Sequence, residues 1–487
     1  MMDMPYLSLL IALPLVGAVL LGVVPVRGRI REVALLVTLV ELALALATLM
    51  AVDPNSHAFQ LQEELPWIPD LNIHYRVGVD GLSALFLPFT ALLFAGVIVA
   101  SPVIQILPRL HFSMLLFLEG ATIGVFTALD TMLFFLFWEL TLAPVYFLVS
   151  LWGIGPRRRE AATKYTLLML VGGVPLLFGF LMAALAHVEP LFDLPSLLAH
   201  PLPPSLQTMV FLLLLVGFGV KTPVLPFHTW LPSVAMQGPT GVVAVMTGLK
   251  LGAYGLLRFA IPMAPEAARS FHWLLAGLGV TGIVYGVLVA LAQTNLRRLL
   301  AYSSISHVGL VVLGLASFSL QGVQGAVFQL LNFTLVAGGL FCLAGFLQHR
   351  FGSTDLIHLG GLARPMPKAA IFFLLLGLGG LGMPLTSGFP AELLLLQGAL
   401  SSHMGAGLAA LGGGIISAAY FLGFYRQAFL GPLRHPYLSR GPDLLPREFL
   451  VLGVLGILLL VGGFFPRLIL GFTRMAAEGW IQRLTTP

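Results

Sequence analysis

Apolar segments of membrane-spanning length recur along almost the whole chain, and they constrain the fold more than any other feature. A helix needs about 20 predominantly apolar residues to cross a bilayer, and about fourteen such segments can be counted. Only 9% of the 487 residues are charged, whereas soluble domains carry about a quarter. The sequence therefore predicts an all-α, polytopic membrane protein. The expected spans are 6–26, 33–51, 82–103, 112–128, 131–152, 164–187, 207–229, 240–261, 272–292, 300–317, 324–347, 369–398, 405–429 and 449–470.

Arginines gather in every second loop, which predicts the orientation of the helices. Loops rich in Lys and Arg stay on the cytoplasmic side, and here they include the runs 157–159 and 297–298. This alternation places both termini on the non-cytoplasmic face and the acidic segment 53–80 in an external loop. We expect the last stretch, 471–487, to lie along the interface as an amphipathic tail.

Two spans are interrupted by proline and glycine. The motif KTPVLPFHTWLP carries two prolines directly after Lys221, and LGMPLTSGFPAE carries two glycines and two prolines before Glu392. Broken helices at membrane depth line protein or water-filled cavities, and a pair of them indicates an inverted-repeat transporter. Because the breaks lie in spans 7 and 12, we expect two five-helix repeats, over spans 4–8 (112–261) and 9–13 (272–429). Residues 1–103 would precede the repeats, and a last helix with its tail, 449–487, would follow.

We assign three arginines near span ends, Arg258, Arg426 and Arg467, to the loops. Seven other charged side chains lie inside the predicted spans, although each costs about 2.5–3.5 kcal/mol at the bilayer centre. They are Glu41, Glu119, Glu139, Lys164, Lys221, Lys250 and Glu392. We expect Glu139 to face Lys221, so that approach of the carboxylate loads a proton on the lysine and separation releases it. The alternatives are a static buried ion pair and a lysine that snorkels to the interface.

The remaining candidate residues could extend the proton path beyond Glu139 and Lys221. Lys250 is expected to pass the proton on, and His307 stands among serines whose hydroxyls could carry a hydrogen-bonded chain. His228 is either a structural histidine or a proton carrier, and Lys164 either joins the path or lies at the surface. Glu119 is a secondary candidate. Glu41 is expected to contact a neighbouring protein or a lipid headgroup.

Motifs for redox or nucleotide chemistry are missing. The chain has no Walker A loop, no Cys-x-x-Cys and one cysteine, Cys342. We therefore predict no catalytic, cofactor-binding or metal-binding residues in this chain, and the net charge of +5 is explained by topology rather than by a nucleic-acid partner. Energy for uphill transport would come from partner subunits, or from exchange with another cation.

The motifs FWELTLAPVYFL, KTPVLPFHTWLP, GLKLGAYGLLRF, AYSSISHVG and SGFPAELLLLQG resemble those of the antiporter-like membrane subunits of complex I, over nearly the whole chain. The resemblance implies proton translocation by Glu139, Lys221 and Lys250, with Lys164 and His307 at secondary positions. Glu392, where several paralogues carry lysine, resembles the NdhD/NuoM type. That residue argues against the alternative, a subunit of a multisubunit sodium/proton antiporter.

Within this type the sequence looks most similar to cyanobacterial NdhD. The resemblance implies a thylakoid or bacterial inner membrane, lipids and other membrane-arm subunits as partners, including neighbouring antiporter-like subunits. It also implies quinone and Fe–S clusters in partner subunits, with NAD(P)H or ferredoxin as the electron donor. Two departures stand out: Asn332 where the family usually has histidine, and a short segment 231–241. They suit a form of the complex that takes up carbon dioxide. Asn332 also lends slight support to a scaffold that has lost transport, but the retained intramembrane charges argue against it.

Overall fold

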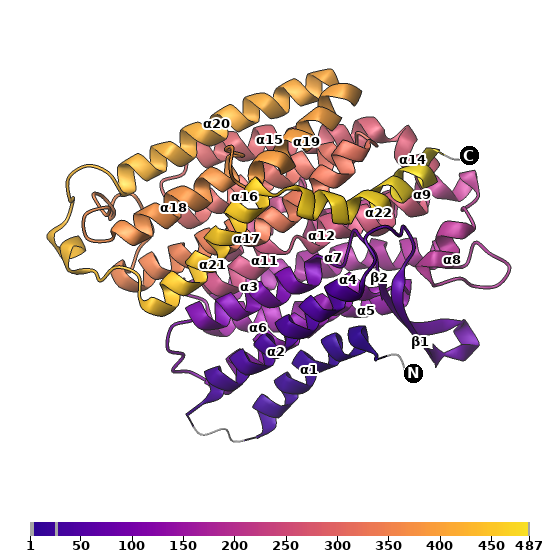
Figure 1. Cartoon of the computed structure of the whole chain (residues 1–487), viewed down its shortest axis with the longest axis horizontal. Helices are drawn as coiled ribbons and strands as arrows, with labels where there is room; N and C mark the ends of the chain where they lie inside the picture. The colour runs from indigo at the N-terminus through magenta and orange to yellow at the C-terminus, as the bar shows by residue number, and fades with distance from the viewer. Residues whose placement is uncertain (1–3, 25–27, 486–487) are drawn as a thin grey trace.

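The computed structural model describes residues 4–24 and 28–485, and its framework is helical (Figure 1). The predicted all-α class is confirmed, with one small hairpin added. The first part contains α1 (Tyr6–Val23), α2 (Ile30–Ala51), β1 (Gln60–Ile68), η1 (Pro69–Leu71), β2 (Ile73–Val79), α3 (Phe86–Ala100), α4 (Pro108–Thr127), α5 (Thr131–Leu140), α6 (Leu142–Trp152), α7 (Arg158–Ala184) and α8 (Leu194–Ala199). The middle contains α9 (Pro204–Lys221), η2 (Phe227–Thr229), α10 (Trp230–Gln237), α11 (Thr240–Gly248), α12 (Leu251–Gly255), η3 (Leu256–Ala260), α13 (Ile261–Met263) and α14 (Pro265–Ser270). The last part contains α15 (His272–Leu291), α16 (Leu296–Leu315), α17 (Leu320–Phe351), α18 (Pro367–Gly380), α19 (Gly388–Ser402), α20 (Met404–Ala428), η4 (Pro436–Arg440), α21 (Pro446–Phe464) and α22 (Arg467–Thr485).

Each span that the sequence predicts has a helix among the described residues, although residues 25 and 26 at the end of the first span lie outside them. Twelve helices are long and apolar enough to cross a membrane. In this count α5 and α6 form one span, Thr131–Trp152, and the elements from α11 to α13 form another, Thr240–Met263. Two shorter apolar helices, α3 and α18, bring the number to fourteen. The helices run side by side in one bundle, and the two ends of the described chain lie at the same end of it (Figure 1).

Both predicted helix breaks are present. Helix α9 ends at Lys221 and is followed by an irregular segment before η2 and α10, and α18 ends at Gly380 while α19 begins at Gly388. Each proline lacks a backbone donor and crowds the preceding turn, so the helix cannot continue through it. A two-fold relation between the halves stays a prediction, as does the division into domains.

The structure adds two interruptions that the sequence analysis did not predict. Between α5 and α6 the regular helix pauses at Thr141. Between α11 and α12, Lys250 adopts a left-handed conformation with φ 39°, and a turn of π-helix, η3, follows. A side chain with a Cβ is strained in that region, and such strain gathers at functional sites.

The predicted external loop and the predicted tail are both more structured than expected. Part of the acidic segment 53–80 forms the antiparallel hairpin β1–β2. The tail forms α22, which packs against the rest of the protein. Its Trp480 is 2% exposed, and the ring N–H donates to the Leu257 carbonyl at 2.8 Å. Part of the apolar face that we expected to meet the membrane interface therefore packs inside the bundle.

Candidate functional site

Lys221 lies at the junction between α5 and α6. Its Nζ donates to Thr141 Oγ1 at 2.7 Å and to the Trp138 carbonyl at 3.2 Å, and it stands 3.9 Å from the centre of the Trp138 ring. The break at Thr141 makes these acceptors available. Lys221 is also the last residue of α9, where the negative end of the helix dipole favours a cation.

Glu139 and Lys221 form no direct ion pair among the described residues, as the alternative of a static buried pair would require. Its carboxylate lies against Gly173 of α7, where an added Cβ would collide with it. Oε1 of Glu139 is buried and has no hydrogen-bond partner among the described residues, although the charges of Glu139 and Lys221 still act on each other. Lys221 is instead hydrogen-bonded to Thr141 and the Trp138 carbonyl, and the approach and separation of Glu139 stay a prediction.

Lys250 is the most deeply buried of the expected lysines, at 3% exposure. Its Nζ donates to Ser304 Oγ of α16 and lies 5.4 Å from the Phe333 ring. A cavity of about 40 Å³ lies between Lys250 and Lys221, and Thr141 and Tyr165 also line it. Since a water needs about 10–15 Å³ of such volume, the cavity has room for about two or three.

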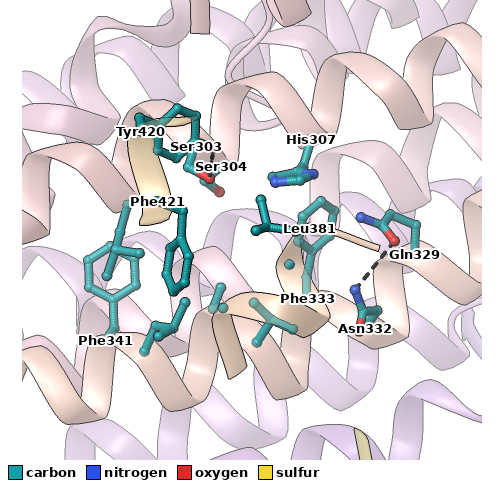
Figure 2. A pocket seen from close by; sticks show the side chains of 16 residues that line it. Ser303, Ser304, His307, Gln329, Asn332, Phe333, Phe341, Leu381, Tyr420 and Phe421 are labelled. Carbon is teal, nitrogen blue, oxygen red and sulfur yellow. Dashed lines mark hydrogen bonds between the residues drawn. The ribbon is translucent and has the colours of Figure 1, made fainter. Parts of the chain in front are cut away.

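A second cavity, of about 40 Å³, is lined by Ser304, the hydrogen-bond partner of Lys250 (Figure 2). Ser304 and His307 of α16 line it, together with Asn332 of α17. Tyr420 of α20 also faces this cavity and donates to Ser303 Oγ at 2.7 Å. Hydroxyl, imidazole and amide groups therefore surround a space next to the Lys250–Ser304 hydrogen bond.

A third cavity, of about 70 Å³, joins His307 to Glu392 on α19. His307 Nδ1 lies 3.5 Å from Glu392 Oε1. Gly382, with φ 61°, sits so close to Glu392 Oε2 that a side chain there would collide with it. The break of span 12 thus brings Glu392 into line with the groups already described.

Lys164 and His228 lie in a separate polar cleft. Lys164 is exposed, so the surface alternative describes its position. The cleft measures about 490 Å³ and is lined by both residues and by Arg157, Glu160, Tyr285, Arg298 and Tyr302. His228 Nε2 and the Tyr285 hydroxyl are 3.1 Å apart. The cleft therefore gathers titratable groups beside the broken span 7 that carries Lys221.

Asn332 braces the break of span 12. Its Oδ1 accepts from Ser387 Oγ at 2.7 Å, and its Nδ2 donates to the Gly379 carbonyl and to Gln329 Oε1 at 3.4 Å each. The residue is 2% exposed. An amide supplies one acceptor and donors at the same time, so Asn332 can hold both sides of the break without carrying charge.

Glu119 and Glu41 lie outside these cavities. Both are fully buried, and they interact with each other between α4 and α2. Thr38 Oγ1 donates to Glu119 Oε2 at 3.1 Å. The expectation that Glu41 contacts a partner or a lipid headgroup is wrong for this structure, because its side chain points into the bundle.

One buried ion pair was not predicted from the sequence. Arg258 of η3, counted among the loop arginines, donates to both oxygens of Asp80 at 2.7 and 2.9 Å, and each side chain is 5% exposed. Burial alone would raise the pKa of Asp80, but the Arg258 guanidinium holds that pKa below its usual range. The signal was present in the sequence, since Arg258 stands within an uninterrupted apolar run.

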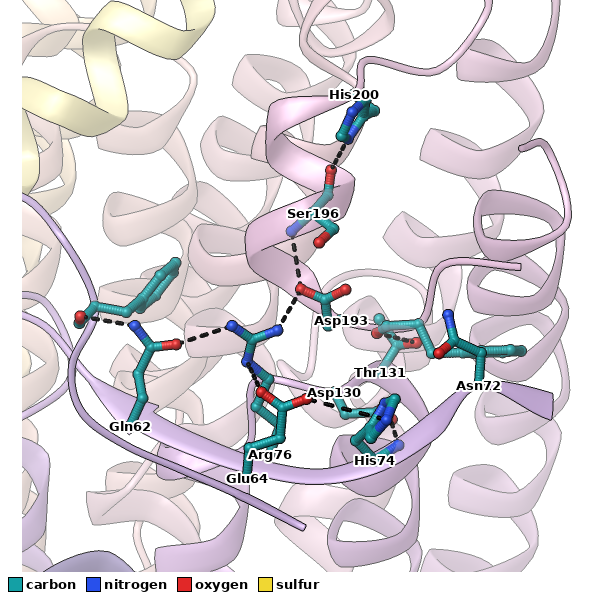
Figure 3. Close-up of polar contacts among 12 residues, drawn as sticks. Gln62, Glu64, Asn72, His74, Arg76, Asp130, Thr131, Asp193, Ser196 and His200 are labelled. Atoms are coloured by element: carbon teal, nitrogen blue, oxygen red, sulfur yellow. Dashed lines mark hydrogen bonds and ion pairs between the residues drawn. The ribbon is translucent and has the colours of Figure 1, made fainter. Parts of the chain in front are cut away.

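The β1–β2 hairpin is held by the caps of two helices (Figure 3). Asp130 caps α5 and accepts from the backbone of His74 at 3.2 Å. Asp193 caps α8 and accepts from Arg76 at 2.9 Å. Each carboxylate thus satisfies helical N–H groups and also attaches the hairpin to the bundle.

A bundle of interrupted helices, whose buried lysines, histidine and carboxylates line small cavities with room for water, defines an ion-translocating membrane protein. Residues 128–417 match the family described as NADH:quinone oxidoreductase/Mrp antiporter, transmembrane region. The chain belongs to this family, which confirms the resemblance seen in the sequence.

Relatives and solved structures agree. The chain is 38% identical to NAD(P)H-quinone oxidoreductase chain 4 1 of Synechococcus sp. (strain JA-2-3B'a(2-13)), covering 96% of this chain and 90% of that one. It is 36% identical to NADH-quinone oxidoreductase subunit M of Rhodobacter capsulatus, covering 95% and 94%. A chain of respiratory complex I from Thermus thermophilus superimposes with a TM-score of 0.91 at 32% identity, over 99% of this chain and 100% of that one. A chain of the Mrp complex from Dietzia sp. DQ12-45-1b, at TM-score 0.86 and 23% identity over the full length of both chains, shares the fold.

Proposed function

We propose that this chain translocates protons within the membrane arm of a complex I-like NAD(P)H–quinone oxidoreductase. The observation that carries the proposal is the line of groups from Lys221 through the first cavity to Lys250, Ser304, His307 and Glu392. Each step is either a direct contact or a cavity with room for water. Such chains of charged and hydrogen-bonding groups inside a membrane bundle are characteristic of proton relays.

The position of Glu139 suggests how a proton is released from Lys221. Movement of the Glu139 carboxylate toward the ammonium would favour the charged lysine, and movement toward Gly173 would weaken that support. The lysine then passes its proton to water in the cavity shared with Lys250. Lys250 in turn donates to Ser304. This order of proton transfers is proposed because Lys221 and Lys250 line the same cavity and Lys250 contacts Ser304.

Access from one side is proposed to run through the polar cleft of Lys164 and His228. The cleft lies beside the irregular segment after Lys221, and His228 belongs to η2 in that same broken span. On the topology inferred from the arginines, it opens to the cytoplasm. Glu392 would then deliver protons toward the next membrane subunit or the opposite face.

Partner subunits would supply the driving energy. The names of the relatives point to a complex that oxidises NAD(P)H and reduces quinone, and we propose NAD(P)H or ferredoxin as donor, with Fe–S clusters and quinone held by other subunits. A cyanobacterial thylakoid or a bacterial inner membrane is the proposed location, with both termini on the non-cytoplasmic side.

The test is donor-driven proton uptake into vesicles containing the whole complex. Lys221→Ala is expected to abolish most of the uptake while the complex still assembles, because no other group replaces the ammonium at the α5–α6 junction. Lys368→Ala, which removes the lysine at the start of α18, is the matched control and should pump normally. Unchanged pumping in the Lys221 variant would refute the proposal.

A sodium/proton antiporter subunit remains the second candidate, supported by the shared fold of the Mrp chain. It predicts that a sodium gradient, without electron donor, drives proton movement through this chain. The His307–Glu392 contact supports the first candidate, since a carboxylate beside the imidazole continues a proton relay. The same vesicles, given a sodium gradient alone, distinguish the two.

We also propose that the complex takes the form that couples pumping to carbon dioxide uptake. The uncharged Asn332 in the second cavity motivates this step, because proton transfer past it has to use water or His307. Mass spectrometry of the subunits that copurify with this chain tests it. Copurification with a carbon dioxide-hydrating subunit is expected; a complex containing only the NADH-oxidising subunits would contradict it.

A further inference from the structure

An amphipathic cavity shares no lining residue with the three cavities of the proposed proton path. It measures about 570 Å³, within the range of about 300–1,000 Å³ typical of small-molecule sites. The start of α11, the C-terminal half of α17 and the loops around α3, α6 and α21 surround it, at the end of the bundle opposite both termini (Figure 1). None of Lys221, Lys250, His307 and Glu392 lines it.

The deep wall of this cavity is apolar. Val97 of α3, Leu115 of α4, Val242 of α11 and Phe346 of α17 line it, and each is 5% exposed or less. Trp152 also contributes its ring surface, because its Nε1 already donates to the Ile106 carbonyl at 2.7 Å. A wall of this kind favours an occupant with a long apolar part.

The mouth of the cavity is positively charged. Arg447 lines it, and its Nε is buried without a hydrogen-bond partner among the described residues. Arg31 lies close enough for the two positive charges to repel each other. Glu448 is the acidic residue of the lining, but Arg350 binds both of its oxygens and the Leu445 N–H occupies one of them as well. The charge of Arg447 is therefore uncompensated.

We propose that this cavity binds one anionic phospholipid, with an acyl chain along the apolar wall and the phosphate at Arg447. Guanidinium groups bind phosphate in charge-assisted hydrogen bonds, and basic pockets between membrane helices bind lipid headgroups. A free phosphate would leave the apolar wall unfilled, and a neutral lipid would leave Arg447 unpaired. The lipid would fill a space that residues of α3, α4, α17 and α21 line together.

The test uses the intact complex in vesicles that contain a phosphatidylglycerol with a photoactivatable acyl chain. After irradiation, cross-linked peptides are mapped by mass spectrometry. Cross-links are expected in segments 97–115 and 342–346, and Arg447→Gln should lower them at least fivefold. Arg426→Gln, which removes an exposed charge at the end of α20, is the matched control and should leave them unchanged.

A second lipid probe tests recognition of charge, and a second variant tests the location of the site. The same acyl label on phosphatidylcholine should cross-link several-fold less; equal labelling would overturn charge recognition, and no labelling in these segments would overturn the site. If Arg447→Gln does not assemble, Ala100→Phe places a large ring in the cavity without changing charge. Retained labelling in that variant would also overturn the proposal. The yield of lipid cross-links is measured directly, so this test does not depend on whether the chain translocates protons.

Discussion

Lys250 Nζ donates a hydrogen bond to Ser304 Oγ, and this contact joins the left-handed break between α11 and α12 to the middle of α16. It connects the lysine cavity to the cavity lined by His307. The two halves of the proposed axis therefore meet at one side-chain contact.

Ser304→Ala removes the acceptor for Lys250 and is expected to slow pumping about three- to tenfold. That is less than the ~100-fold or more typical of losing a positioned proton-transfer group, because water in the adjoining cavities replaces the hydroxyl in part. The measurement is proton uptake per electron transferred in vesicles. Ser303→Ala is the matched neighbour, since Ser303 accepts from Tyr420 rather than from Lys250; an equal loss in both variants would contradict a specific role for the contact.

Gly173→Ala is expected to push the Glu139 carboxylate away from α7, because the new Cβ would occupy its position. If separation of Glu139 from Lys221 allows proton release, this variant should assemble but pump less per electron. Infrared difference spectra of the carboxylate band should report the move. Gly277→Ala on α15 meets no neighbour within 4 Å and serves as the control. A normal spectrum and normal pumping in Gly173→Ala would show that the position of Glu139 does not matter.

Asp80→Asn is expected to destabilise the chain by about 3–5 kcal/mol, since it leaves the Arg258 charge buried without its partner. Assembly of the complex, measured by native electrophoresis after heating, should fail at a lower temperature. The double variant Asp80→Asn/Arg258→Met should recover much of the loss, because no charge then stays buried. No recovery would mean that the pair is needed for more than charge balance.

The same pair predicts a pH dependence. The pKa of Asp80 is lowered in the folded chain, whereas an unfolded aspartate titrates near about 3.9. Its stabilisation is therefore fully present above about pH 5 and is lost as the pH falls through the lower folded value. The difference in Tm between wild type and Asp80→Asn should stay constant from about pH 5 to 8 and narrow only in stronger acid. A difference that shrinks near neutral pH would contradict this reading.

Asn332→Ala should loosen the break of span 12 by leaving the Ser387 hydroxyl without its acceptor, at a cost of about 1–3 kcal/mol. Faster hydrogen exchange across 381–390 is the expected result. Asn332→Asp keeps an acceptor for Ser387 and should exchange more slowly than the alanine variant. Equal exchange in wild type and both variants would show that Asn332 does not brace the break.

The sequence determined those features that arise within a few residues of the chain. Spanning segments follow from local apolar length, and the breaks after Lys221 and before Glu392 follow from prolines that remove backbone donors. The residue types of the proposed axis were also visible, because charge in an apolar segment is costly enough to stand out.

Tertiary packing decided which of these groups meet. Lys250 interrupts its helix without a proline, and Gly252 beside it packs against Thr222 and Phe218 of the broken span 7. Glu139 lies against Gly173 of α7, and Arg258 pairs with Asp80, 178 positions away along the chain. Such contacts depend on how distant helices approach one another, and local hydropathy holds no information about that approach, so only the folded bundle could decide them.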